Sequence, residues 1–185
     1  MEGNIHYLIG PIFYKNMYKP NSGDPNVPDR NDFSFVVQGD VNSFGSLEIS
    51  MSHINRDFYR NDDGQFAAEQ LESMKMGMGY RRWIHSKWNF GLILTTTYAM
   101  EEPNIIQKNP SGNTLATSAS QVSTFGFLGS IEYIPWENGQ NSVVLDVSFE
   151  RNLTSKPGES RDFMQTMIGF RRFVQSKYMN KLLQQ

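Results

Sequence analysis

The stretch LEISMSH (residues 47–53) alternates a large side chain with a small or charged one at every step. Successive side chains of a β-strand point to opposite faces, so this stretch predicts a strand with one apolar and one polar face. Seven further segments share the period of two, which predicts eight strands in all. They are residues 5–14, 32–41, 44–55, 70–84, 88–100, 122–136, 141–152 and 161–175. Several are longer than the ~5–6 residues typical of soluble strands and reach the ~9–11 that a tilted strand needs to cross a bilayer.

Residue size predicts which face points inward. A closed barrel of eight strands has an interior only just wide enough for side chains. The apolar faces carry Trp, Phe, Met and Leu, which would overfill that interior, while the opposite faces carry mainly Gly, Ser, Thr and a few ions. We therefore expect the apolar faces to point outward into lipid. No run of about 18 apolar residues exists, so no transmembrane helix is expected.

The connections between the predicted strands alternate in length. Those at 15–31, 56–69 and 101–121 are long and that at 153–160 is moderate, while those at 42–43, 85–87 and 137–140 are short. In an antiparallel barrel this alternation places every long loop at one end. The pattern resembles small eight-stranded outer-membrane β-barrel proteins. The resemblance implies an all-β, closed, antiparallel, up-and-down transmembrane barrel in the bacterial outer membrane, with both termini on the periplasmic side.

A repeat of about 90 residues divides the predicted barrel. The segment GYRRWIHSKW (79–88) returns as GFRRFVQSKY (169–178), and LEISM (47–51) returns as LDVSF (145–149). We interpret this as two duplicated four-stranded halves, about 5–84 and 88–175, within a single barrel domain at 1–176. Residues 177–185 are expected to form a short periplasmic tail. No signal peptide precedes residue 5, and we expect that one has been removed.

Alternation places a set of charged residues inside the predicted barrel. Near the short-turn end, each half is expected to supply two carboxylates around one guanidinium, since an unpaired charge in a narrow lumen is costly. The expected outcome is a lumen closed by ion pairs, and the alternative is a gate or narrow ion path. The inward set is Asp40, Glu48, Lys75, Arg81, Glu132, Asp146, Glu150 and Arg171.

Aromatic and basic residues gather at the short-turn end. Such side chains prefer the headgroup layer of a membrane, so they predict an interfacial girdle, with binding of anionic lipid headgroups as the sharper alternative. The girdle set is Tyr80, Arg82, Trp83, Lys87, Trp88, Trp136, Phe170, Arg172, Phe173, Lys177 and Tyr178.

No enzyme, cofactor or metal site is expected. His53 lies beside Ser52 and close to Asp57, but adjacent residues of a strand face opposite sides, so a Ser-His-acid set is not predicted. The three histidines fall on different segments and there is no cysteine, which argues against a metal site. The net charge of −2 offers no basic field for nucleic acid.

Three functions remain open at this stage. The first is a structural or lipid-interacting barrel that contacts phospholipid or lipopolysaccharide, with small outward residues such as Gly39 and Gly129 allowing a homo-oligomer. The second is a narrow pore or a carrier of small apolar molecules. The third is a lipid-modifying enzyme of the outer membrane.

Overall fold

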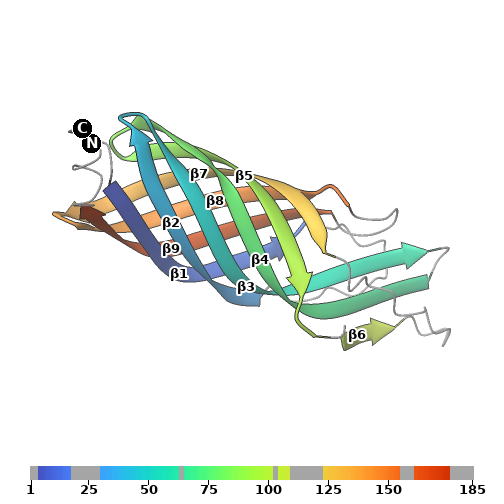
Figure 1. Cartoon of the computed structure of the whole chain (residues 1–185). Coiled ribbons are helices and arrows are strands. Elements are labelled where there is room, and N and C mark those ends of the chain that lie inside the picture. Colours follow the sequence, from blue (N-terminus) through green and yellow to red (C-terminus); the bar gives the residue numbers. More distant parts are fainter. Residues whose placement is uncertain are drawn as a thin grey trace.

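The computed structural model describes residues 4–17, 30–62, 65–101, 104–108, 123–154 and 161–175. These ranges form nine β-strands (Figure 1). The strands are β1 (Asn4–Asn16), β2 (Arg30–Asn42), β3 (Gly45–Asp62), β4 (Gln65–His85), β5 (Trp88–Ala99), β6 (Asn104–Lys108), β7 (Thr124–Asn138), β8 (Asn141–Asn152) and β9 (Asp162–Gln175). The described residues contain no helix long and apolar enough to cross a membrane.

Eight of these strands close into a barrel. The sheet order is β3-β2-β1-β9-β8-β7-β5-β4, and β3 also pairs with β4, which joins the two ends. All neighbours are antiparallel, and β1 lies between β2 and β9. The predicted fold class, a closed up-and-down antiparallel barrel of eight strands, is confirmed.

Two-residue turns close one end of the barrel. They lie at 43–44, 86–87 and 139–140, so Phe44 belongs to a turn and not to the predicted third strand. Gly139 has φ of 59°, the left-handed region that the favoured two-residue hairpin turns require. β1 begins and β9 ends at this same end of the barrel (Figure 1).

The opposite end carries an extension that sequence reasoning assigned to a loop. β3 and β4 stay paired from Gly45↔Arg82 out to Asp62↔Gln65, so the predicted loop at 56–69 is wrong. β6, which lies in the predicted loop at 101–121, adds a third strand by pairing with β4 (Figure 1). The hydrogen bonds between paired strands come from the backbone. A segment without an apolar face can therefore continue the pairing. In the sequence, Asp63-Gly64 is a favoured hairpin dipeptide and indicates a hairpin at this point.

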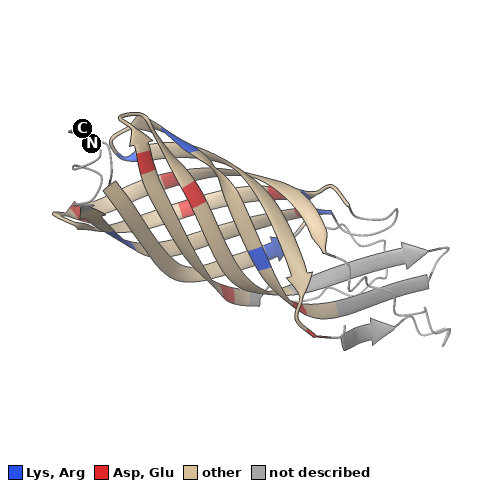
Figure 2. Ribbon diagram, viewed as in Figure 1, with Lys and Arg blue, Asp and Glu red and all other residues tan. Residues whose placement is uncertain are grey.

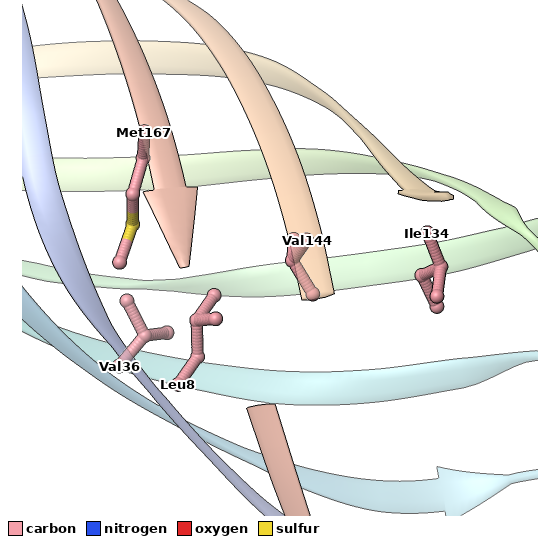
Figure 3. Packing of buried hydrophobic residues seen from close by; sticks show 5 residues of the cluster. All are labelled: Leu8, Val36, Ile134, Val144 and Met167. Carbon is pink, nitrogen blue, oxygen red and sulfur yellow. The ribbon is translucent and has the colours of Figure 1, made fainter. Parts of the chain in front are cut away.

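The wall of the barrel is apolar outside and mixed inside. On β5 the side chains alternate between exposed and buried along the strand, and most of the wall bears neither acidic nor basic residues (Figure 2). The expectation of an inner face that is small, polar and charged is incomplete. The interior also holds an apolar cluster of Leu8, Val36, Ile134, Val144 and Met167 (Figure 3).

Glycines inside the barrel make room for these apolar side chains. A Cβ at Gly169 would collide with the side chain of Leu8, and one at Gly77 would lie 2.8 Å from Cγ2 of Ile93. Small and large residues of neighbouring strands therefore interlock on the inner face, which is how an eight-stranded interior accommodates Leu and Ile.

Candidate functional site

The structure buries all eight side chains of the inward set, with exposures of 0–9%. Seven of them fall into two groups that lie six residues apart on β4, one around Arg81 near the short turns and one around Lys75, while Asp40 has other partners. A cavity of about 50 Å³ lies between the groups and is lined by Arg81 and Asp146 from one and by Lys75 from the other. The interior is therefore nearly filled at this level.

Arg81 is the centre of the larger group. Its Nε donates to Glu48, its Nη2 lies 3.1 Å from Asp146 Oδ2, and its Nη1 lies 3.7 Å from Glu132 Oε2. Nη1 also donates to Asn89 Oδ1 at 2.9 Å, and the amide of Asn89 in turn donates to Glu132 at 2.5 Å. These contacts join β3, β4, β5, β7 and β8 across the lumen.

Arg171 has a much sparser environment. Its Nη2 forms an ion pair with Glu132, the carboxylate that Arg81 also contacts. Its guanidinium carbon lies 5.6 Å from the centre of the Trp83 ring, within cation–π range. Within the described residues, none of its three guanidinium nitrogens makes a hydrogen bond of good geometry.

The equal sharing of carboxylates between the two arginines is therefore wrong. Among the described residues, Arg81 has three carboxylate partners and Arg171 has one. Asp40, expected beside Arg81, contacts His6 Nε2 at 3.0 Å and accepts from Ser46 Oγ at 2.6 Å instead. Sequence reasoning missed His6, although its place on β1, two residues before buried Leu8, was available as a signal.

The second group joins β4 to β8 and β9. Lys75 Nζ donates to Glu150 Oε2 at 3.1 Å and to Gln165 Oε1 at 2.6 Å. Glu150 also accepts from Thr95 Oγ1 at 2.9 Å. The lysine and the carboxylate are each 5% exposed at the side chain, so the pair is shielded from bulk solvent. Gln165 was not singled out from the sequence, because an uncharged amide gives no pairing signal.

The predicted girdle divides between the two faces of the barrel. Exposed members are Tyr80, Arg82, Lys87, Trp88, Trp136, Phe170 and Arg172. Trp83 and Phe173 were misplaced, because each follows a buried arginine by two residues and so shares its inner face. Trp83 donates Nε1 to Ser46 Oγ at 3.2 Å. Lys177 and Tyr178 lie outside the described residues.

His53 and Ser52 face opposite sides of the wall. Ser52 is buried and lies 2.8 Å from Ser34 Oγ, while His53 Nε2 contacts Glu72 Oε1 at 2.5 Å on the outer surface. Asp57 belongs to the part of β3 whose side chains are not described. No group of three potential metal ligands occurs among the described residues.

Comparisons with known proteins agree with this architecture. No protein-family model matches the sequence, and no curated protein gives a significant match. Among solved structures, the chain is similar to the outer-membrane protein OprG of Pseudomonas aeruginosa, at 9% identity and a TM-score of 0.57, over 95% of this chain and 97% of that one. It is also similar to Ail, the attachment invasion locus protein of Yersinia pestis. A crystal structure of Ail gives 11% identity and a TM-score of 0.52, and a structure in a phospholipid bilayer nanodisc gives 14% and 0.54, each over 94% of this chain and 100% of that one. The fold of this chain is that of small eight-stranded outer-membrane barrels.

Proposed function

We propose that this protein is an integral barrel of the bacterial outer membrane with a lumen closed by ion pairs and a structural or lipid-interacting role. The observation that carries the proposal is the reversed distribution of polarity. Leu47, Ile49 and Met78 are 56–67% exposed on the outside, while Glu48, Glu132 and Arg171 are at most 3% exposed inside. In water this arrangement would expose apolar surface and bury charge. In a bilayer the apolar surface contacts lipid and the charges are kept away from it.

The contacts described above support a closed lumen. Ion pairs around Arg81 link strands on opposite sides of the barrel, and a second set around Lys75 lies farther along the lumen. Breaking such a pair leaves a buried charge uncompensated, so opening a path through the lumen is energetically costly.

Single-channel recording in a planar bilayer tests this part of the proposal. The native chain is expected to give no open events, and Arg81→Ala, which removes the guanidinium at the centre of the group, is expected to give them. Large, steady conductance of the native chain would instead favour a pore. Uptake of small apolar molecules into vesicles that contain the native chain would favour a carrier.

The lipid-interacting role rests on the exposed basic members of the girdle. Arg82, Lys87 and Arg172 lie among exposed aromatic residues at the short-turn end, where long basic side chains reach headgroups. The triple variant Arg82→Gln, Lys87→Gln, Arg172→Gln is expected to lose the preference of the native chain for anionic over zwitterionic bilayers. An equal affinity of the native chain for both bilayers would contradict the role. Cross-linking in the same bilayers tests the proposed homo-oligomer.

A further inference from the structure

The short-turn end of the barrel contains a cavity of about 500 Å³ that the closed-barrel proposal does not use. Its size falls within the ~300–1,000 Å³ typical of small-molecule sites. The inner part is lined by His6, Asp40, Trp83, Ile134, Arg171 and Phe173. Arg81 is not among the lining residues, whereas residues of all three short turns are, so the cavity lies between the Arg81 group and the short turns.

Aromatic rings form one wall of this cavity. The imidazole of His6 lies near two rings, with centroid distances of 6.5 Å to Trp83 and 6.0 Å to Phe173. Trp83 and Phe173 are only partly buried, so each presents ring surface to the space. Together with Ile134 they offer an apolar lining that an alkyl or aryl group would fill.

Hydrogen-bonding capacity remains at the polar side. Arg171 is 3% exposed, and its only carboxylate contact among the described residues is the single ion pair with Glu132. A guanidinium has five N–H donors, so this side chain can donate to further anionic oxygens. His6 Nδ1 also has no hydrogen-bond partner among the described residues.

Of the two acids in the cavity lining, Glu137 is exposed and Asp40 already has hydrogen-bond partners. Asp40 Oδ1 accepts from Ser46, and Oδ2 contacts His6 Nε2. Arg171 therefore differs from Asp40 in having donors to spare. The imbalance favours a ligand that brings acceptor oxygens over one that brings a cation.

We propose that this cavity binds a small amphiphilic acid, with its anionic head toward Arg171 and its apolar body against Trp83 and Phe173. Such a ligand completes the hydrogen bonding of Arg171 and covers the exposed ring surface. Its entry from the short-turn side places its source in the periplasm or the inner leaflet of the membrane.

Quenching of tryptophan fluorescence by a brominated acid tests the proposal. The chain contains three tryptophans, and Trp88 and Trp136 are exposed on the outside, so a Trp88→Phe, Trp136→Phe chain reports from Trp83 alone. In zwitterionic nanodiscs, ω-bromoundecanoate is expected to quench this emission with saturation. The matched neutral probe, ω-bromoundecanol, is expected to produce only the linear quenching of a probe dissolved in the bilayer.

Two neighbouring phenylalanines of β9 provide matched variants that leave the ion pairs intact. Phe173→Ala, in the cavity, is expected to raise the half-saturating acid concentration by about tenfold, the loss of roughly one aromatic contact. Phe170→Ala, on the outside, is expected to change the half-saturating acid concentration by less than about twofold. Linear quenching by the acid, saturation by acid and alcohol alike, or equal effects of the two variants would each overturn the proposal.

Discussion

Arg81 and Arg171 occupy the same place in two copies of one sequence pattern, yet their surroundings differ. Both follow a glycine and an aromatic residue and precede a second arginine. Both are buried on the inner wall. Arg81 lies among three carboxylates from three strands, whereas Arg171 contacts one carboxylate of the described chain and the face of Trp83.

The register of the neighbouring strand explains the difference. Arg81 pairs with Ser46 and Arg171 pairs with Ser142, so these serines occupy equivalent positions. Two residues farther along, the first half has Glu48 and the second half has Val144. The repeat of LEISM as LDVSF aligns Glu48 with Asp146. Asp146 lies two residues beyond Val144 and contacts Arg81 instead of Arg171. A repeat can thus preserve the sequence of each strand while a shift in pairing redistributes the contacts.

The largest effect is expected from removing each arginine in turn. Arg81→Met leaves Glu48 and Asp146 without a cation and is expected to lower the free energy of unfolding by about 3–5 kcal/mol. Arg171→Met leaves Glu132 still in contact with Arg81 and Asn89, so it is expected to lower the free energy of unfolding by only about 1–3 kcal/mol. Urea titration of the folded barrel in phospholipid vesicles measures both.

A surface ion pair at the opposite end supplies the control. Arg151 donates to Asp162 at 2.8 Å, but its side chain is 58% exposed. Arg151→Met is therefore expected to behave like the native chain in the same titration. Equal losses for Arg81→Met and Arg171→Met would show that the two environments are energetically alike, contrary to the contacts.

A smaller effect is expected from giving the second half the carboxylate that the first half has. Val144→Asp places an acid in the position equivalent to Glu48, beside Arg171. A double-mutant cycle with Arg171→Met is expected to show a favourable coupling of about 1–3 kcal/mol between the introduced carboxylate and the arginine. Ile54→Asp, a buried substitution level with Ser73 and far from Arg171, should show no coupling with Arg171→Met. Absence of coupling at both positions would contradict the register explanation.

The alternation of side chains predicted much of this molecule from sequence. Period two indicated the strand number and the outward face, because lipid and lumen impose opposite polarity on successive residues. It also selected Lys75 and Glu150, which the structure joins across the lumen. The polarity of the side chains did not predict the extended β3–β4 hairpin, because the hydrogen bonds that pair the strands come from the backbone.

Pairing across the lumen was beyond the reach of the sequence. Which carboxylate meets which arginine depends on register and on strand tilt, and a shift of two residues keeps every side chain on its face while changing its neighbours. Trp83 and Phe173 show a different failure. Their aromatic character suggested the membrane interface, although the alternation that placed Arg81 inside placed Trp83 inside as well.

The aromatic contact of Arg171 is expected to contribute less than the buried ion pairs around Arg81. Trp83→Leu removes the ring beneath the guanidinium and the hydrogen bond to Ser46, and a loss of about 1–2 kcal/mol is expected. The counterpart Phe173→Leu removes a ring for which no contact with Arg81 or Arg171 is seen among the described residues, so a smaller loss is expected. Thermal unfolding of the two variants side by side measures the difference, and a larger loss for Phe173→Leu would contradict it.

The smallest effect is expected where the two halves should be alike. Arg82 and Arg172 directly follow the two buried arginines and are exposed on the outer wall. An outward side chain contacts solvent or headgroups whatever the register of the neighbouring strand. The difference in register that gives Arg81 and Arg171 different partners should therefore not affect Arg82 and Arg172. Arg82→Gln and Arg172→Gln should each change the free energy of unfolding by less than about 0.5 kcal/mol, and by equal amounts, in urea titration. Unequal losses would show that the asymmetry of the halves extends through the wall, and would require a cause other than register inside the lumen.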